Sequence, residues 1–345
     1  MEKIVLALSG GVDSAVAVHL LQEKGYEVYG YTFLTGDDQK KRRIIAEDAA
    51  AVAKHFGISH KIDDIAAEFD ATVVRYFADK YFHGETPNPC VYCNRTMKFP
   101  KLLAYADSLG IEKIATGHYV RLEEGRIFRG KDRKKDQSYV LCLLPESWYH
   151  RLVFPLGDYE KKQIRVVAAN LGLPVAEKAE SQENCFVPND DYKTFLRQYP
   201  SRFQQGDFLD GEGRVLGHHN GLPFYTVGQR RGIGLAFGSP KYVVKLDAAK
   251  NAVIIGEEEE LFTTSCLVKN VNLIGKSGEE GFSCAVKIRY QSQPAAAAIE
   301  PRGNGVFEVK FEKPLKSVTP GQYAVFYGGD DDQLFGGGEI TSDRR

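Results

Sequence analysis

A pair of glycines between an apolar run and a helical pattern is the feature that most constrains how this chain can fold. Residues 3–8 are β-branched and leucine-rich, which predicts a buried strand. The segment Ser9–Ser14 (SGGVDS) follows at once, and Val12, Val16 and Leu20 then form one apolar face of a helix that Gly25 would end. A strand, a glycine turn and a helix in this order predict the start of a parallel α/β sheet.

The rest of the first half repeats this alternation. Further strands are expected at residues 26–33, 60–65 and 112–116, with helices at residues 45–56, which Gly57 would end, and around residues 102–106. Alternating strands and helices indicate a doubly wound parallel sheet covered on both faces. Ligands of such sheets bind at the carboxyl ends of the strands, where the Ser9–Ser14 segment lies.

The last third contains strand patterns only, at residues 242–246, 252–255, 284–290, 306–311 and 323–327. In the segment Val306–Glu312, apolar and charged residues alternate, which is typical of a sheet with one solvated face. Short, evenly spaced strands predict a small β-barrel or sandwich. Residues 188–240 are rich in glycine and aromatic residues without a long period, so we expect a small mixed domain in the middle.

The composition and charge of the chain limit the number of domains and the kinds of partner that it can bind. The 345 residues, 43% of them hydrophobic, are enough for two or three domains. Forty-five Lys and Arg against 46 Asp and Glu give a net charge of −1, so a polyanion would have to bind local basic clusters. Basic clusters lie at residues 40–43, 129–135 and 230–231. Such short charged runs are more often solvated surface than binding sites. The longest apolar stretches are far too short to span a membrane, and no leader pattern is present, so we expect a cytoplasmic protein without membrane contact.

The Ser9–Ser14 segment has the chemistry of a phosphate site. Gly10 and Gly11 let backbone amides approach an anion, and the helix N-terminus adds partial positive charge. No Gly-Lys-Ser/Thr follows, so this is not a Walker loop. The segment resembles the SGGxDS loop of ATP pyrophosphatases, which adenylate a substrate and release pyrophosphate. Asp13 would repel phosphates unless a cation bridges them, which suggests that it positions Mg²⁺.

Three of the six cysteines lie in polar surroundings. Cys90 and Cys93 form a C-x-x-C that two prolines precede, and Cys185 follows the polar segment Ser181–Asn184. No second ligand pair completes a structural zinc site, and the prolines do not suit a thioredoxin-like redox pair. Cys142, Cys266 and Cys284 lie in apolar or strand-like segments and are expected to be buried fillers. ATP activation together with exposed thiols points to sulfur chemistry.

These features together resemble the tRNA-specific 2-thiouridylases, the MnmA family, over essentially the whole chain. The resemblance is carried by Ser9–Ser14, Thr86–Asn94, Ala115–Tyr119 (ATGHY), Lys135–Tyr139 (KDQSY), Ser181–Phe186, Thr226–Gly232 (TVGQRRG), Arg289 with Tyr290, and Thr319–Tyr327 (TPGQYAVFY). It implies ATP-dependent 2-thiolation of the wobble uridine, position 34, of tRNA. It also implies an ATP-pyrophosphatase domain at 1–187, a central domain at 188–257 and a tRNA-binding β-barrel at 258–345.

The resemblance also assigns roles to residues. Cys185 would carry a persulfide, and Cys93 would attack it or form a disulfide with Cys185. The ATP site would comprise Ala7, Leu8, Ser9, Gly10, Gly11, Val12, Asp13, Ser14, Phe33 and Gly117. Contacts to tRNA would come from Asn88, Pro89, Cys90, His118, Lys135, Asp136, Gln137, Arg289, Tyr290 and Gln322. The implied partners are wobble-uridine tRNAs for Lys, Glu and Gln, and a sulfur-donor protein or cysteine desulfurase relay.

One position departs from the family pattern. Many members carry Asp where this chain has Cys90, so acid/base work by that residue is in doubt here. Cys90, Cys93 and Cys185 could together hold a labile [4Fe-4S] cluster with one open iron, as an alternative to the cluster-free persulfide route. Two other functions stay open: a different adenylating synthetase of the ATP-pyrophosphatase type, and a noncatalytic RNA-binding protein.

Overall fold

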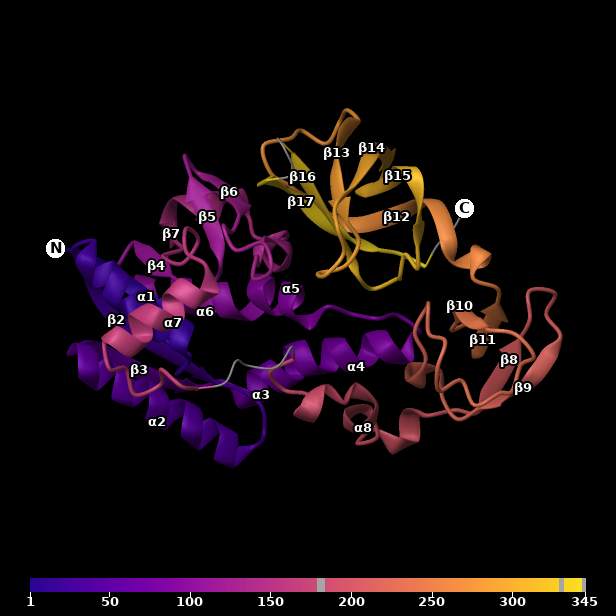
Figure 1. Ribbon diagram of the computed structural model, residues 1–345, viewed down its shortest axis with the longest axis horizontal. Coiled ribbons are helices and arrows are strands. Elements are labelled where there is room, and N and C mark those ends of the chain that lie inside the picture. The colour runs from indigo at the N-terminus through magenta and orange to yellow at the C-terminus, as the bar shows by residue number, and fades with distance from the viewer. Residues whose placement is uncertain (179–183, 329–331, 343–345) are drawn as a thin grey trace. The chain divides into compact units, whose positions relative to one another are not determined.

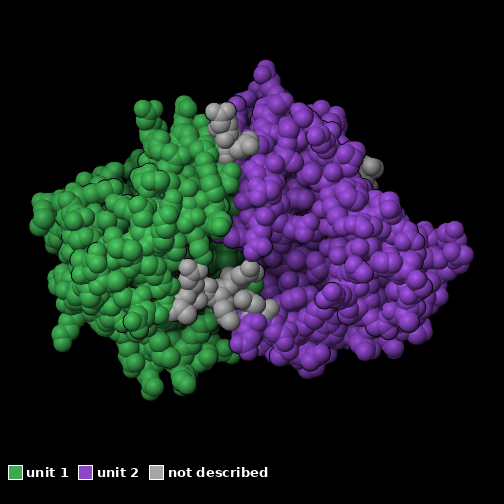
Figure 2. All heavy atoms as spheres, viewed as in Figure 1, with its two compact units in different colours: residues 1–74, 90–186, 332–334 green, residues 75–89, 187–331, 335–345 purple. Residues whose placement is uncertain are grey.

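The computed structural model describes residues 1–178, 184–328 and 332–342 (Figure 1). The chain forms two compact units, coloured separately in Figure 2. Unit 1 comprises Met1–Val74, Cys90–Phe186 and Asp332–Leu334, and unit 2 comprises Arg75–Pro89, Val187–Asp331 and Phe335–Arg345. The chain therefore passes from unit 2 to unit 1 between Pro89 and Cys90. The expected domain limits at 187/188 and 257/258 stay predictions.

Unit 1 is built on a parallel sheet of five strands in the order β3-β2-β1-β4-β7. Its strands are β1 (Glu2–Ala7), β2 (Tyr26–Leu34), β3 (Ser59–Asp64), β4 (Lys113–Ala115) and β7 (Leu152–Val153). The chain moves outward from β1 through β2 and β3 on one side and continues with β4 on the other. The α/β fold class predicted from the sequence is confirmed, and the switch of direction between β1 and β4 marks the usual ligand-binding edge.

The helices of unit 1 have local reasons for their limits. They are α1 (Val12–Glu23), α2 (Gln39–Phe56), α3 (Ala66–Phe69), α5 (Pro89–Cys93, whose first residue is in unit 2), α6 (Phe99–Ser108) and α7 (Lys161–Asn170). The Asp38 carboxylate accepts the Lys41 N–H and caps α2, a contact worth about 1 kcal/mol. Gly57 ends α2 in the left-handed conformation at φ 65°, which confirms the predicted stop. The sheet and these helices enclose a core that includes Ile4, Leu6, Val16 and Val52.

One helical segment carries the C-x-x-C. A π-helical turn at Asn94–Lys98 joins α5 directly to α6. Such turns are uncommon and occur frequently at functional sites. Both Cys90 and Cys93 therefore lie on a short helix rather than in an extended loop. A hairpin of β5 (Val120–Glu123) and β6 (Arg126–Arg129), which the sequence analysis did not predict, completes unit 1.

The middle of the chain contributes a small mixed sheet to unit 2. Its strands are β8 (Gly206–Leu209), β9 (Val215–His219), β10 (Tyr242–Asp247) and β11 (Ala252–Gly256), in the order β10-β11-β8-β9. Phe208, Val243 and Val253 are buried in its core. Helices α4 (Arg75–Phe82) and α8 (Tyr192–Leu196) also belong to unit 2, where the Tyr81 and Tyr192 rings stack at 4.6 Å between centroids.

Unit 2 ends in a closed antiparallel β-barrel. Its strands are β12 (Phe262–Leu273), β13 (Phe282–Lys287), β14 (Ala295–Gly303), β15 (Val306–Lys316), β16 (Tyr323–Gly328) and β17 (Gln333–Ile340). Strand β12 pairs with both β15 and β17, which closes the ring. Phe307, Val309 and Phe311 point into the core, as their alternation predicts, so the expected C-terminal barrel is confirmed.

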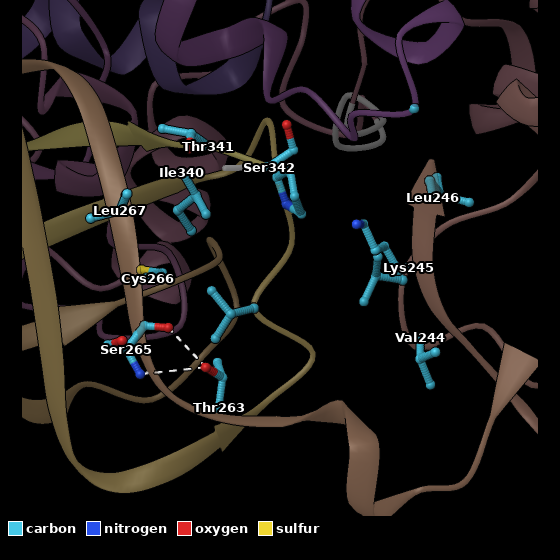
Figure 3. Close-up of a pocket in the computed structure, with 14 residues that line it drawn as sticks. Val244, Lys245, Leu246, Thr263, Ser265, Cys266, Leu267, Ile340, Thr341 and Ser342 are labelled. Carbon is cyan, nitrogen blue, oxygen red and sulfur yellow. Dashed lines mark hydrogen bonds between the residues drawn. The ribbon is translucent and has the colours of Figure 1, made fainter. Parts of the chain in front are cut away.

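A pocket in unit 2 lies between strand β10 and the β12 and β17 side of the barrel (Figure 3). Most of its lining is apolar or carries hydroxyl groups, and Lys245 contributes an amine from β10. None of the residues that the sequence analysis assigned to catalysis is among those that line it.

Candidate active site: the phosphate loop and the thiols

The Ser9–Ser14 segment is closed by its own hydrogen bonds. The Ser9 N–H donates to Ser14 Oγ at 3.1 Å, and the Ser14 hydroxyl donates to the Gly11 carbonyl at 3.0 Å. Gly10 has φ +67°, and a Cβ there would lie 3.0 Å from Asp48 Cβ and from the Ile45 carbonyl oxygen. Glycine is therefore required at position 10, both for the conformation and for the close approach of α2.

The residues predicted to bind ATP come together at one edge of the sheet. Ala7 and Leu8 end β1, and Phe33 lies near the end of the neighbouring strand β2. Gly117 follows β4, and a Cβ on it would lie 3.4 Å from the Ser14 backbone nitrogen. Gly117, which has no side chain, thus lies next to the N-terminus of α1. This leaves room for an anion beside the N–H groups of the first turn of α1. Binding of ATP by these residues stays a prediction.

Two lysines that the sequence analysis did not single out face the phosphate loop. Lys161 Nζ donates to both carboxylate oxygens of Asp13 at 2.7 Å, and the Tyr119 hydroxyl donates to Asp13 Oδ1 at 2.6 Å. Lys178 Nζ donates to the Gly10 carbonyl at 2.9 Å and to Asp48 Oδ2 at 2.5 Å. These lysines lie about 150 residues or more further along the chain, so no local pattern could have revealed them.

Asp13 is the residue predicted to position Mg²⁺, and here its carboxylate is already paired with Lys161. Magnesium prefers carboxylate and water oxygens, so an ion on Asp13 would have to displace the lysine amine. Within residues 1–178, 184–328 and 332–342, no group of three or more His, Cys, Asp or Glu side chains is placed to hold a metal ion. In the structure the Asp13 carboxylate pairs with Lys161, and its role in positioning Mg²⁺ stays a prediction.

Cys93 and Cys185 belong to the same electrostatic cluster in unit 1. Burial raises the pKa of the Cys93 thiol to about 11, and the nearby Cys185 raises it further, while Lys98 acts in the opposite direction. Burial of its surroundings likewise raises the pKa of the Cys185 thiol, although the residue keeps an exposed surface, and Lys98 and Lys41 lower it. Cys185 therefore acts on the pKa of the Cys93 thiol, and one lysine, Lys98, acts on the pKa of both thiols.

The segment that carries Cys185 is anchored to the parallel-sheet unit. Lys41 Nζ, from the first turn of α2, donates to the Cys185 carbonyl at 2.5 Å. The Phe186 ring contacts the Phe69 ring, with the centroids 5.7 Å apart. Lys41 belongs to the basic cluster at residues 40–43, so at least one member of that cluster, although exposed, has a structural partner. Ser181–Glu183 lie outside the described residues.

The three thiols considered for an iron–sulfur cluster are not gathered into a ligand set. Cys90 and Cys93 lie three residues apart on α5, and Cys185 is near Cys93, yet the described part of the chain holds no metal-binding group of three or more such side chains. A [4Fe-4S] cluster needs its thiolates around one centre. The described side chains are therefore not preassembled as a cluster site, and a cluster held by Cys90, Cys93 and Cys185 stays a prediction.

Three residues predicted to contact tRNA in unit 1 have structural partners. His118 is buried beside Phe99, its Nδ1 lies 2.7 Å from Thr116 Oγ1, and burial holds its pKa well below the ordinary value. The buried Asp136 carboxylate accepts hydrogen bonds from the Arg129 side chain, the Gly130 and Ser138 N–H groups and the Ser138 hydroxyl. The Gln137 side chain accepts the Tyr119 N–H at 3.1 Å. Lys135, in the same loop, is half-buried.

The remaining predicted tRNA contacts lie in unit 2 or where the chain leaves it. Arg289, after β13, is exposed, and its Nη2 donates to the carbonyls of Lys316 and Ser317 at 3.1 Å. The neighbouring Tyr290 ring has Lys287 Nζ 5.7 Å from its centroid. Gln322 Nε2 donates to the Thr86 carbonyl at 2.7 Å. Asn88 and Cys90 are half-buried and Pro89 is buried, and contact of any of these residues with tRNA stays a prediction.

The chain as a whole matches known families. Residues 2–189 match a tRNA methyl transferase HUP domain, residues 193–257 a tRNA methyl transferase PRC-barrel domain, and residues 263–340 an aminomethyltransferase beta-barrel domain. A parallel-sheet HUP domain followed by these two barrel domains defines the class of tRNA-modifying enzymes with this three-part chain.

The relatives identify the family within that class. The tRNA-specific 2-thiouridylase MnmA of Pelotomaculum thermopropionicum is 45% identical over 99% of this chain and 97% of its own length. Those of Heliobacterium modesticaldum and Carboxydothermus hydrogenoformans are 44% and 43% identical, over 99% and 98% of this chain and 92% and 97% of their own lengths. The chain belongs to the family of tRNA-specific 2-thiouridylases, as the sequence motifs predicted.

Solved structures are more distant. A 4-thiouridine synthetase–RNA complex with bound ATP has 19% identity and a TM-score of 0.38, over 58% of this chain and 51% of that chain. The NMN synthetase of Francisella tularensis has 18% identity and a TM-score of 0.36, over 58% of this chain and 77% of that chain. Among the helices that the structure describes, none combines the length and apolarity needed to cross a membrane.

Proposed function

We propose that this chain is a tRNA sulfurtransferase that uses ATP to convert the wobble uridine, position 34, of tRNA to 2-thiouridine. One observation carries the proposal. In a chain of the 2-thiouridylase family, the phosphate loop lies in the same unit as the thiols of Cys93 and Cys185. Wobble-uridine tRNAs for Lys, Glu and Gln are the proposed substrates, and a sulfur-donor protein or cysteine desulfurase relay supplies the sulfur.

The first step makes the uracil carbonyl reactive. The C2 carbonyl is a poor electrophile, so its oxygen attacks the α-phosphorus of ATP, pyrophosphate leaves, and O2 becomes part of an AMP leaving group. The N–H groups at the start of α1 and the amines of Lys161 and Lys178 would hold the phosphates and the charge that develops on them. A base in the anticodon loop must leave its stack to reach such a site, which costs a few kcal/mol.

The second step replaces oxygen by sulfur. The terminal sulfur of a persulfide on Cys185 attacks C2, and AMP leaves with the former O2. The Cys93 thiolate then attacks the Cys185 sulfur, which releases 2-thiouridine and forms a Cys93–Cys185 disulfide. A thiol reductant donates two electrons to restore both thiols. The coupling of the two thiols through one cluster with Lys98 supports this pairing.

Pyrophosphate release measured with and without tRNA tests this function. A 2-thiouridylase should release pyrophosphate mainly when tRNA is present, and the product tRNA should contain 2-thiouridine. Release without tRNA would instead favour another adenylating synthetase, and no release in either case would favour a noncatalytic RNA-binding protein. Cys185→Ser should form no 2-thiouridine while it still releases pyrophosphate, because a hydroxyl cannot carry a persulfide.

A Cys90→Asp variant tests the sulfur route. In the cluster-free route this substitution restores the residue that is commoner in the family, so activity with a persulfide donor in air should persist. If a [4Fe-4S] cluster operates, iron content and activity should be lost together, because two thiolates rarely retain four irons. Iron content and 2-thiouridine formed per enzyme, measured aerobically and anaerobically, decide between the two routes.

A further inference from the structure

A turn of the barrel holds the chain just before the helix that carries the C-x-x-C. The turn is Thr319–Gln322, between β15 and β16, and it contacts Thr86 from two sides. The Thr86 N–H donates to the Pro320 carbonyl at 2.8 Å, and Gln322 Nε2 donates to the Thr86 carbonyl at 2.7 Å. Both backbone polar groups of Thr86 are therefore bound by this one turn.

The approach is close enough to require glycine. Gly321 has φ +87°, and a Cβ on it would lie 2.9 Å from both Glu85 Cβ and the Thr86 backbone nitrogen. The turn itself is fixed to β17, because the Gly321 N–H donates to the Ile340 carbonyl and the Ile340 N–H donates to the Gln322 carbonyl, at 2.9 and 2.8 Å. Thr86 is thus held by a rigid part of the barrel.

Neighbouring contacts hold the preceding helix to the same barrel. Lys80 of α4 pairs with Glu85 at 2.5 Å and also with Glu339 of β17, and these three side chains are largely buried. The Tyr76 hydroxyl lies 3.2 Å from that of Tyr323, the first residue of β16. These contacts and the turn all lie within unit 2.

Only two residues separate the held Thr86 from the cysteine helix. Pro87 and Asn88 link Thr86 to Pro89, the first residue of α5, and both prolines are buried. Proline fixes φ and restricts the residue before it, so this linker has little freedom to absorb a displacement of Thr86. The position at which the barrel holds Thr86 therefore sets the start of the helix that carries Cys90 and Cys93.

We infer that Gln322 is a positioning residue for the C-x-x-C, acting through Thr86, in addition to any contact that it makes with tRNA. Its side-chain amide donates one hydrogen bond to the Thr86 carbonyl. The inference rests on the proposed function, since it concerns the thiol helix used in the sulfur transfer.

The test compares Gln322→Met, Gln205→Met and Arg289→Ala in the full chain. Without tRNA or ATP, Gln322→Met should speed hydrogen exchange of the amides of residues 86–93 by about two- to tenfold, the effect of one lost hydrogen bond. It should lower kcat for thiolation about tenfold with little change in the KM for tRNA, because a small misplacement of reacting groups is costly. Gln205→Met, at an exposed side chain of unit 2, should change neither.

Arg289→Ala should show the opposite pattern, with weaker tRNA binding and unchanged exchange at residues 86–93. Gly321→Ala should speed the hydrogen exchange at residues 86–93 further. If the Gly321→Ala variant does not fold, the Gln322→Met variant alone still tests the inference. Unchanged exchange in Gln322→Met, or a loss confined to tRNA affinity, would overturn the inference. Failure of the proposed function is distinct, because the wild-type protein would then form no 2-thiouridine while the exchange result still stands.

Discussion

At the scale of single residues, the phosphate loop depends on a charge pair that joins distant parts of the chain. Asp13 follows the loop glycines, and Lys161 begins α7, yet the Lys161 amine lies 2.7 Å from both Asp13 oxygens. A carboxylate at a phosphate-binding helix N-terminus would repel the ligand if its charge were not balanced. The Lys161 amine supplies that balance, and in the proposed function it would also contact the phosphates of ATP.

This pair gives the first prediction. Lys161→Met should lower pyrophosphate release about 100-fold, the usual cost of one lost electrostatic contact to a transition state. Asp13→Ala should abolish release while the fold persists. Both are measured as pyrophosphate formed per enzyme in the presence of tRNA, with circular dichroism to confirm folding.

The neighbouring Lys162 provides the control. Its side chain is 80% exposed and pairs with Glu160, so Lys162→Met should leave the rate unchanged. Equal rates in Lys161→Met and wild type would show that the reaction needs neither a phosphate contact from Lys161 nor its neutralisation of Asp13. If Lys161→Met stays active and Asp13→Ala keeps only a residual rate that rises with magnesium concentration, Asp13 acts on the metal instead.

At the scale of elements, the helix run from α5 through the π-helical turn to α6 brings Cys93 and Lys98 together. Lys98 ends the turn, and its charge and backbone N–H both favour the Cys93 thiolate, although burial outweighs them and keeps the pKa near 11. The resting thiol is therefore protonated at neutral pH, which protects it from adventitious oxidation.

This geometry gives the second prediction, on pH dependence. Because the pKa is raised, the thiolate fraction grows with pH up to about 11, so the rate of Cys93 alkylation by iodoacetamide should rise about tenfold per pH unit from 7 to 10. Lys98→Met removes a charge that lowers the pKa, so alkylation at pH 9 should slow. Cys185→Ser removes a group that raises the pKa, so alkylation should become faster.

Mass spectrometry of the peptide that contains Cys93 measures these rates. Lys98→Arg should preserve the wild-type rate, and Lys101→Met, which alters a lysine of α6 paired with Glu68, should have no effect. A plateau of the wild-type rate near pH 8.5 would contradict the raised pKa. An unchanged rate in Lys98→Met would show that Lys98 does not act on this thiol.

The same elements show what the sequence could and could not predict. Glycine and apolar spacing predicted the first two helices and four strands of the parallel sheet, because local conformation and burial determine both. The two-residue strand β7 is too short to give a pattern. Strand β14 (Ala295–Gly303) was missed because a run of alanines has no alternation, β12 because polar residues interrupt its pattern, and β17 because it contains three successive glycines. Lys161, Lys178 and Lys98 were missed as site residues, since only tertiary folding brings them to the loop and the thiols.

At the scale of the whole molecule, the residues proposed to carry out the reaction and the C-terminal barrel belong to different units of the chain. The phosphate loop and both coupled thiols lie in unit 1, and Arg289, Tyr290 and Gln322 lie in unit 2. The net charge of −1 gives no general attraction for RNA, so local basic residues would have to supply the contacts to phosphate. Many basic residues are already paired, as Arg133 is with Asp332, whereas Arg289 is exposed and its guanidinium donates to two carbonyl oxygens.

The last prediction follows from this placement. Arg289→Ala should weaken tRNA binding and reduce the slope of log affinity against log salt by about one unit, because one phosphate contact and its released counterion are lost. ATP affinity should change little, since Arg289 lies in the other unit from the phosphate loop. Arg302→Ala is the matched control, as Arg302 is an arginine of the same barrel that pairs with Glu308. Filter binding at several salt concentrations measures the slopes. Equal slopes for wild type and Arg289→Ala would show that Arg289 does not touch the tRNA backbone, and a reduced slope in Arg302→Ala would place the contact elsewhere on the barrel.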